Sequence, residues 1–410
     1  MPESRLAMRA YPIFAAVVVT WLLFGISPHA AARTPTACDY LSESIDGQPN
    51  GPVFLASFPT VRSGPLDGTA YLYDNAVATV ALVACGQPQK AALIADAIIL
   101  ALDHDRYWHD GRLRNAYQAG PVGQGPLKLA GWWDAQQNKW LEDFYQVGSA
   151  SGNLAWAILA LLAVDASSHN RSYVEAATRI GTWLMRWRSE LGPGGFTGGT
   201  FGEEPDPRSE MWKSTEQNAD LAAAFAGLAA ATGDKQWLRD AQLAEDFVLA
   251  MWNRSCTCFS AGTTEDGITA NHFLALDAQV LPLLALPDAA IRYVGAFETA
   301  TARLSDSGGF SFGETKGGMW TEGTAQAALF AELSGRQAEA ASLITAIQGM
   351  QAADGSCYAS SALKLSTGLP LETDPTQLRQ YFHVAHLGAT AWAAIAEQKY
   401  NPLIRKSALP

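Results

Sequence analysis

Six segments of this chain are predicted to form helices that are apolar on almost every side, and this pattern limits the possible folds most. Each opens with polar residues and continues in Ala, Leu and Val, and they begin near Asp74, Asn153, Thr215, Asn271, Thr321 and His383. In the segment at Thr321, this residue can cap the helix, and Glu322 would lie in the first turn, where the helix dipole favours negative charge. Residues 325–333 then leave almost no polar face. Because such a helix must be covered on all sides, the six segments should pack inside a shell of other elements.

A second set of helices is amphipathic, with charged residues on one face, and alternates with the first set. It comprises residues 89–102, 172–191, 235–252, 288–304 and 337–351. Alternation typical of strands is nearly absent. We therefore predict an all-α fold, an (α/α)6 toroid or six-hairpin barrel in which amphipathic outer helices wrap apolar inner helices. An open solenoid fits less well, because solenoid repeats keep a more constant period.

The N-terminus has the layout of a secretory signal. Arg5 and Arg9 precede an apolar run at residues 14–26, and small Ala residues follow at 30–32. The run is short for a spanning helix, which needs ~20 residues, so cleavage is favoured over an uncleaved anchor. We predict a signal peptide at residues 1–32, a Pro/Gly-rich extension at 33–66 and a toroid catalytic domain at 67–404, in a periplasmic or secreted protein.

Charge and cysteine content exclude several classes of function. The net charge is −12 without any basic run, which argues against nucleic acid or an anionic membrane as partner, apart from the signal segment. Five cysteines suit one or two disulfides in an exported protein, with one thiol unpaired. Cys256 and Cys258 lack the spacing of a zinc site, so we expect no metal. The sequence also lacks GxSxG, P-loop and dinucleotide motifs, so we expect no cofactor.

Three of the apolar helices open with Tyr73-Asp74-Asn75, Ser214-Thr215-Glu216-Gln217-Asn218 and Trp320-Thr321-Glu322-Gly323. In these openings and in its helix pattern the chain resembles the (α/α)6-toroid glycoside hydrolases and the related polysaccharide lyases, over most of residues 70–402. The resemblance singles out no one family. It implies a glycan bound across the funnel at the N-terminal ends of the inner helices. For a hydrolase of this fold, it also implies an inverting mechanism.

The catalytic candidates are Glu216, Glu322 and Asp74. Glycosidases need a carboxylic acid for the leaving oxygen and a second carboxylate as base or nucleophile. Glu216 and Glu322 each follow a nearby Trp and open an apolar helix, where burial would raise a carboxyl pKa. Asp74 lies between Tyr73 and Asn75. Capping alone also selects acids in a first helical turn, and the sequence leaves open which acid takes which role.

Polar and aromatic side chains at the predicted rim are the candidates for substrate binding. They are Tyr73, Asn75, Arg112, Arg114, Tyr117, Trp133, Glu142, Asn153, Trp212, Asn218, Asp266, Asn271, Trp320, His383 and His386. Aromatic faces among them would stack on pyranose rings.

Each of these candidates also has a structural explanation. The arginines can pair with rim acids, and Asp266 can hold a turn. The two histidines, three residues apart, can satisfy a helix end. Two further acids, Asp220 and Asp277, lie inside apolar helices and would need a rim hydrogen bond or an ion pair.

These observations predict an exported, monomeric glycoside hydrolase that cleaves a polysaccharide or oligosaccharide, such as a bacterial exopolysaccharide or a β-glucan. One alternative is a polysaccharide lyase, with Tyr117, Tyr381 or His383 as base and Arg112 or Asn75 neutralising a uronate. Another alternative is a non-catalytic glycan-binding accessory protein for polysaccharide export.

Overall fold

The computed structural model describes residues 34–371 and 374–404, so the predicted signal peptide at residues 1–32 lies outside the described residues. The helices of this part are α1 (Ala37–Asp46), α2 (Leu72–Ala84), α3 (Pro88–Asp103), α4 (Phe144–Val147), α5 (Ser151–Ser168), α6 (Arg171–Leu184), α7 (Thr215–Thr232), α8 (Gln236–Ala250), α9 (Leu276–Ala285), α10 (Ala289–Arg292), α11 (Gly295–Leu304), α12 (Thr321–Leu333), α13 (Gln337–Gln348) and α14 (Leu387–Glu397). A 3-10 turn, Met185–Trp187, follows α6.

Short strands connect these helices. They are β1 (Val53–Phe54), β2 (Thr69–Tyr71), β3 (Ala116–Gln118), β4 (Gly120–Pro121), β5 (Trp132–Asp134), β6 (Lys139–Leu141), β7 (Ser149–Ala150), β8 (Gly199–Phe201), β9 (Arg208–Glu210), β10 (Trp252–Asn253), β11 (Cys258–Phe259), β12 (Gly262–Thr263), β13 (Ala270–Asn271), β14 (Ser305–Asp306), β15 (Gly309–Phe310), β16 (Cys357–Tyr358), β17 (Lys364–Pro370), β18 (Leu378–Phe382) and β19 (Ala385–His386). They pair antiparallel in small sheets, of which β7-β8-β9 has three strands. Most are two or three residues long, too short for a period of two to be visible in the sequence.

Within the described residues, six apolar helices contact one another in chain order and close into a ring. Helix α2 packs on α5, α5 on α7, α7 on α9, α9 on α12 and α12 on α14, and α14 returns to α2. These are the segments predicted as apolar on all sides. In α12, every residue from Thr321 to Ala331 is buried. A helix without a polar face gains most from such a position, because apolar area is removed from water on all its sides.

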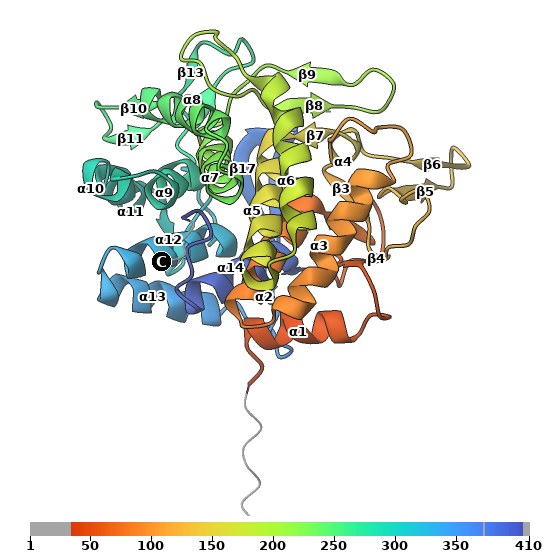
Figure 1. The fold of residues 1–410 in the computed structure, drawn as a ribbon. Coiled ribbons are helices and arrows are strands. Elements are labelled where there is room, and N and C mark those ends of the chain that lie inside the picture. The colour runs from red at the N-terminus through yellow and green to blue at the C-terminus, as the bar shows by residue number, and fades with distance from the viewer. Residues whose placement is uncertain (1–33, 372–373, 405–410) are drawn as a thin grey trace, which may run out of the picture. The chain divides into compact units, whose positions relative to one another are not determined.

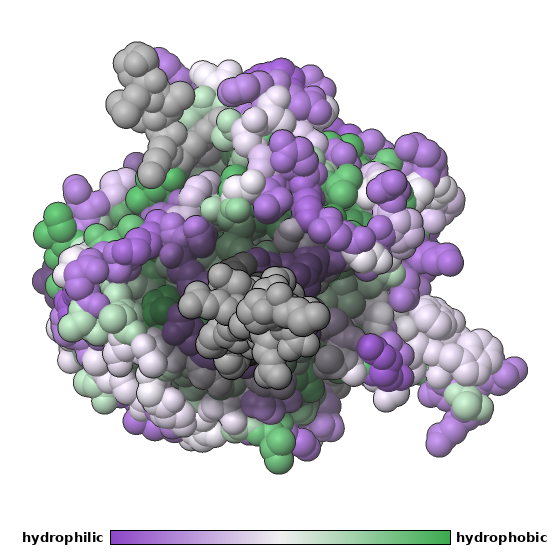
Figure 2. Space-filling view, turned by 90° about the horizontal axis from the view of Figure 1, so that it is seen from below, coloured by the Kyte–Doolittle hydropathy of each residue, from purple (hydrophilic) through white to green (hydrophobic). Residues whose placement is uncertain are grey.

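The amphipathic helices lie outside this ring, where each covers one or two inner helices. Helix α3 contacts α2 and α5, α6 contacts α5 and α7, and α8 packs on α7. Helices α10 and α11 pack on α9, and α13 lies against α12 and α14. Figure 1 shows α3 and α6 outside α5. Seen from below, the surface in Figure 2 is a mixture of hydrophilic, intermediate and hydrophobic residues.

Helix α1, which the sequence does not predict, covers α14 and α2 and so completes the outer layer. Thr36 caps it in a capping box with Asp39. A disulfide joins Cys38 in α1 to Cys85 at the end of α2. A second joins Cys256 to Cys258, and Cys357 is a buried free thiol, so the odd count leaves one cysteine unpaired as expected.

Two of the inner helices begin later than predicted. Asn271 lies in β13, where it pairs with Gly262, and α9 starts only at Leu276. His383 follows β18, and α14 starts at Leu387. In both places the polar residues belong to the connecting loop, because a short strand pair forms before the helix.

Helix α5 is long and apolar enough, by length and composition, to cross a membrane. Most of it is buried inside the ring, with α2 and α7 on its two sides. In the part of the chain that the structure describes, α5 is therefore a helix of the protein core.

Candidate active site

A cavity of about 1030 Å³ lies at the N-terminal ends of the six inner helices. Each helix contributes a side chain from its first turn or from the residue just before it. These residues are Tyr73 and Asp74 of α2, Asn153 of α5, Glu216 of α7, Asp277 of α9, Glu322 of α12 and His386 before α14. The convergence of first turns on one site, which the sequence predicts, is therefore present.

Glu322 accepts a hydrogen bond from Tyr73, and Tyr73 in turn accepts one from Trp392. Tyr73 Oη donates to Glu322 Oε1 at 2.5 Å, and Trp392 Nε1 donates to Tyr73 Oη at 2.9 Å. Because the indole can only donate, the single phenol proton is left for Glu322. The glutamate is 4% exposed. This chain orients one carboxylate oxygen and leaves Oε2 for other contacts.

Asp74 is bonded to a histidine of defined tautomer. His386 Nδ1 accepts from the backbone N–H of Ala389 at 3.3 Å, as the cap of α14. In a neutral imidazole the proton then sits on Nε2, which lies 3.2 Å from Asp74 Oδ2. Phe58 stacks on the imidazole ring at 4.7 Å between centroids. The ring is thus fixed from both sides, and it donates to Asp74.

Gly388, the second residue of α14, lets Asp74 and Glu322 approach each other. A methyl group added at Gly388 would lie 2.6 Å from Asp74 Oδ1 and 3.3 Å from Glu322 Oε2. Both carboxylates therefore face the same bare Cα, and any side chain there would push into them. This close approach requires glycine.

Three acids of the cavity, Glu322, Glu216 and Asp277, have raised pKa values, and burial is the largest cause for each. Burial, with the charges of Asp74 and Asp277, raises the pKa of Glu322 to about 7, although His386 and the Tyr73 hydrogen bond act in the opposite direction. Glu216 is half-buried against the cavity. Burial and the nearby acids, Asp277 first, raise its pKa well above 4.5. Burial raises the pKa of Asp277 to about 6.

Asp74 also determines the charge of His386. Burial lowers the pKa of the imidazole, but the negative charge of Asp74 and its hydrogen bond outweigh this, and the net shift is upward. The cavity therefore holds two carboxyls with raised pKa values, Glu216 and Glu322, of which Glu322 has a pKa of about 7. Carboxyls whose pKa values are pushed apart suit separate acid and base roles.

Asp220 lies one helical turn below Glu216 and is 1% exposed. Among the described residues, neither of its carboxylate oxygens has a hydrogen-bond partner of normal geometry. Burial raises the pKa of Asp220 well above its ordinary value, so the group is held neutral. Asp277 instead accepts from the backbone N–H of Ala278 and lines the cavity. Of these two interior acids, only Asp277 reaches the rim.

Besides Glu216 and Glu322, five of the predicted site residues line the cavity, and the others do not. The five are Tyr73, Asp74, Asn153, Trp320 and His386. Asn75 and Asn218 are buried and grip the preceding loops: each exchanges two hydrogen bonds with a backbone, of Leu55 and of Phe196 respectively. Gln279 of α9 does the same. The expectation that the two asparagines contact sugar is corrected, because their amides hold loops onto inner helices.

Arg114 and Tyr117 belong to a buried network away from the cavity. Arg114 is 0% exposed and binds Asp105 through two hydrogen bonds of 2.6 and 2.9 Å and Glu204 through a third of 2.8 Å. Tyr117 Oη accepts from the backbone N–H of Arg114. With its charge matched by two carboxylates, the guanidinium stabilises the loop and is not a glycan ligand.

Arg112 and Glu142 are also paired with protein charges. Arg112 binds Asp110 at 2.9 Å and stacks on Trp108 at 3.6 Å. Glu142 accepts two hydrogen bonds from Arg106, of 2.6 and 2.7 Å. Arg112 therefore forms an ion pair with an acid, which is the structural explanation named for it above, whereas no ion pair was predicted for Glu142.

The remaining predicted residues serve loops and hairpins. Trp133 is 57% exposed on the β5–β6 hairpin, which extends from the body in Figure 1. Trp212 donates to Glu210, and Asp266 accepts from the backbone of its own turn. Asn271 accepts from the backbone two residues on.

His383 and His386 do not share a partner. His383 Nδ1 lies 2.6 Å from the carbonyl oxygen of Ser360, and its ring stacks on Tyr358. His386 binds Asp74 in the cavity. Among the described residues, no group of three or more potential metal ligands comes together.

Several cavity residues were not predicted as site residues. Asp277 lies in the first turn of α9, as Glu216 and Glu322 do in their helices. It was not predicted because the start of this helix was placed near Asn271 instead of at Leu276. Tyr381 and Arg379 come from β18, and Tyr145 from α4. Tyr381 was considered above only as the base of a lyase, and Arg379 was not predicted at all, since the β17–β18 hairpin itself was not predicted.

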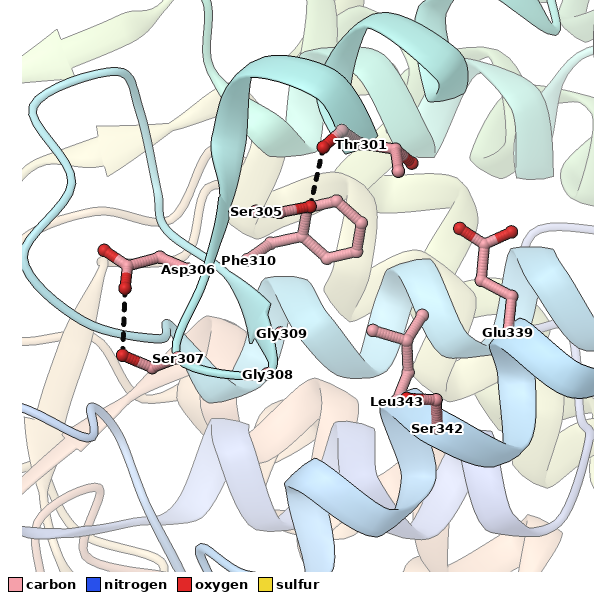
Figure 3. A pocket seen from close by; sticks show the side chains of 10 residues that line it. All are labelled: Thr301, Ser305, Asp306, Ser307, Gly308, Gly309, Phe310, Glu339, Ser342 and Leu343. Carbon is pink, nitrogen blue, oxygen red and sulfur yellow. Dashed lines mark hydrogen bonds between the residues drawn. The ribbon is translucent and has the colours of Figure 1, made fainter.

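A second cavity, of about 420 Å³, lies between α11, the β14–β15 hairpin and α13 (Figure 3). Two of its hydroxyl groups are already bonded locally: Ser305 donates to the carbonyl of Thr301, and Ser307 donates to Asp306. Asp306 also accepts from the backbone N–H groups of residues 317 and 318. This cavity has no counterpart of the Glu216 and Glu322 arrangement within the described residues.

Comparison with known proteins gives relatives in structure alone. No protein-family model matches the sequence, and no curated protein matches it. A solved glycosidase superposes with a TM-score of 0.58 at 13% identity, and the match covers 90% of this chain and 96% of the glycosidase. A glycosidase variant in complex with glucose gives the same TM-score at 14% identity, and that match covers 88% of this chain and 95% of the variant. An α-amylase from Clostridium perfringens gives 0.62 at 11% identity, covering 89% and 97%. A GH76 α-mannanase from Bacteroides thetaiotaomicron gives 0.53 at 12% identity, covering 88% and 94%.

The likeness to these glycosidases extends over nearly all of both chains, so this chain has a glycoside hydrolase fold. The resemblance to glycoside hydrolases of this class that the sequence indicates is confirmed at the level of the fold.

Proposed function

We propose that the protein is an (α/α)6-toroid glycoside hydrolase that uses Glu216 as general acid and Glu322 as general base. The observation that carries this is that Glu216 and Glu322, on the first turns of two inner helices, line one cavity in which the pKa of both is raised. The closed ring of inner helices inside an outer layer supports the toroid arrangement.

The causes of the pKa shifts support the assignment of roles. Burial and the charges of Asp277, Asp220 and Glu322 raise the pKa of Glu216, and only the charge of Arg379 opposes them, so we assign Glu216 as the carboxyl that keeps its proton. A protonated carboxyl is the form that a general acid needs. Glu322, with a pKa of about 7, is substantially ionised above neutrality and can accept a proton from water.

In the proposed reaction, Glu216 transfers its proton to the glycosidic oxygen as the bond from this oxygen to the anomeric carbon breaks. A water molecule attacks the anomeric carbon from the opposite face and gives a proton to Glu322. The product has the inverted anomeric configuration, in keeping with the expectation from the fold resemblance. Tyr73 positions Glu322, and the Asp74–His386 pair sets the charge around it.

The substrate is a glycan, for which the sequence suggests a bacterial exopolysaccharide or a β-glucan. Two structural neighbours are called an α-amylase and an α-mannanase, and a third is a glucose complex, so α-glucans and α-mannans also belong in a substrate screen. The proposed enzyme acts as a monomer, without cofactor, in the periplasm or outside the cell after removal of the signal peptide.

Lyase chemistry has less support. Of its candidate residues, Tyr117, Arg112 and Asn75 have other partners outside the cavity, and His383 binds a backbone carbonyl. Tyr381 lines the cavity, but burial and the nearby acids raise its pKa well above 10. The ionised form that a base requires is therefore scarce at neutral pH. Ultraviolet absorbance of products from uronate polymers would reveal a lyase.

The test is a screen of polysaccharides for new reducing ends, run on wild type, Glu216→Gln and Glu322→Gln. Both variants should lose at least ~10²-fold in kcat, because each lacks a group needed in the transition state. Glu332→Gln, on the outer end of α12 and paired with Lys399, is the matched control and should keep wild-type activity. Full activity in both cavity variants would show that the acids are wrongly assigned. Binding without turnover would indicate the accessory-protein alternative.

A further inference from the structure

The β17–β18 hairpin forms one wall of the cavity, and its two attachments determine how a glycan can enter. It precedes α14 in the chain, and its strands pair from Lys364 with Phe382 to Pro370 with Leu378. Side chains from both strands line the cavity, among them Ser366, Arg379 and Tyr381. The hairpin therefore lies over the acids.

One attachment is on the α9 and α12 side of the ring. The Tyr381 ring stacks on Trp320, the residue before α12, with 5.3 Å between centroids. A methyl group added at Gly368 of β17 would lie 3.0 Å from the ring of Phe273, which precedes α9. Thr315 donates to the backbone of Ser366. Aromatic packing thus fixes the hairpin to this side.

The other attachment is on the α5 side. The Arg379 guanidinium carbon lies 6.0 Å from the centroid of the Tyr145 ring, within range of a cation–π contact. Tyr145 belongs to α4 and accepts a hydrogen bond of 3.3 Å from Asn153 of α5. In the ring order α2, α5, α7, α9, α12, α14, helix α5 lies opposite α12. Side chains of the hairpin consequently contact both sides of the mouth, with Tyr381 on the α12 side and the Arg379 guanidinium reaching Tyr145 on the α5 side.

The β17–β18 hairpin with its two attachments, called the strap below, keeps the internal segments of a long polymer out of the cavity. An internal segment could reach the acids only by being laid into an open groove, whereas a chain end can be threaded under the strap. We propose that this protein acts on chain ends only, as an exo-acting glycoside hydrolase, with the β17–β18 hairpin as the barrier. This inference rests on the proposed hydrolase function.

The test uses a polysaccharide that the reducing-end screen has shown to be cleaved. Viscosity and reducing ends are followed together, and a macrocyclic glycan of the same linkage is offered as a substrate without ends. Reducing ends should accumulate while viscosity changes little, and the macrocycle should be cleaved at least ~10-fold more slowly than the linear glycan. A rapid fall in viscosity with an early ladder of oligosaccharides, or equal cleavage of the macrocycle, would overturn exo action while leaving hydrolysis by Glu216 and Glu322 intact. Absence of hydrolysis in the screen itself would instead contradict the proposed function.

Two variants test the strap. Arg379→Ala and Tyr145→Ala each remove the contact on the α5 side and should increase the viscosity loss per reducing end several-fold. Arg303→Ala, which breaks a surface pair with Glu314, is the control and should leave this ratio unchanged. If Arg379→Ala and Tyr145→Ala both keep the wild-type ratio of viscosity loss to new reducing ends, the hairpin is not the barrier.

Discussion

Replacing Glu322 by glutamine should make the protein more stable at neutral and alkaline pH while abolishing its activity. Burial raises the pKa of this carboxyl from an ordinary value of 4.5 to about 7. At about 1.4 kcal/mol for each pKa unit, this corresponds to about 3 kcal/mol of folding free energy that the wild type loses at high pH. Glutamine has nearly the same shape, carries no charge, and can still accept from Tyr73 Oη through its amide oxygen.

The sign follows from proton binding. Between pH 4.5 and about 7 the unfolded chain releases the Glu322 proton while the folded protein keeps it, so the free energy of unfolding falls as pH rises. Below pH 4.5 both states are protonated, and the wild type and Glu322→Gln should differ little. Above pH 7 the variant should exceed the wild type by about 3 kcal/mol, or on the order of 5 °C in Tm.

The assay is a series of thermal and denaturant unfolding curves at pH values from 4 to 9. Glu332→Gln is the control on the same helix, because its carboxylate lies outside the cavity and is paired with Lys399, which lowers its pKa. That variant should show no gain in stability as pH rises above 5. A constant difference between wild type and Glu322→Gln over the whole range would refute the reasoning that the buried charge opposes folding.

Four further outcomes are expected. In the wild type, kcat/KM should rise with pH through about 7 as Glu322 loses its proton, and a profile without this limb would exclude it as the base. Tyr73→Phe removes a hydrogen bond that lowers the pKa of Glu322, so the same limb should move to higher pH. Gly388→Ala places a methyl group 2.6 Å from Asp74 Oδ1 and should reduce kcat by ~10²-fold through displaced acids, with a Tm close to that of the wild type, as steady-state kinetics and thermal unfolding can check. Replacing both Cys38 and Cys85 by Ser opens a loop with a sequence separation of 47 and should cost about 4 kcal/mol in urea unfolding; an unchanged free energy would contradict the pairing.

The position of the candidate active site could be predicted from the sequence because its signals are local. Apolarity on all sides of residues 321–333 requires a buried helix, whatever the rest of the chain does. An acid in the first turn of such a helix must lie at the rim. Glu216, Glu322 and Asp74 were found in this way, and the structure brings all three to one cavity.

The partner of each of these residues could not be read from the sequence. Tyr73 and Glu322 are separated by 249 positions, and Asp74 and His386 by 312, yet both pairs are hydrogen-bonded. Adjacent residues also diverge: Asp74 faces the cavity, whereas Asn75 points into a loop. Successive side chains of a helix differ by ~100° in direction, and only packing fixes which of them faces inward.

The sequence by itself therefore determined the inner and outer helices and the rim on which the acids lie, since helix burial depends on composition over a few turns. Tertiary structure alone decided the raised pKa values of Glu216 and Glu322, the matching of Arg114 by carboxylates, and the contacts of the β17–β18 hairpin with both sides of the cavity mouth. These features arise from contacts between distant segments and from the exclusion of water, and neither is encoded in any local window of residues.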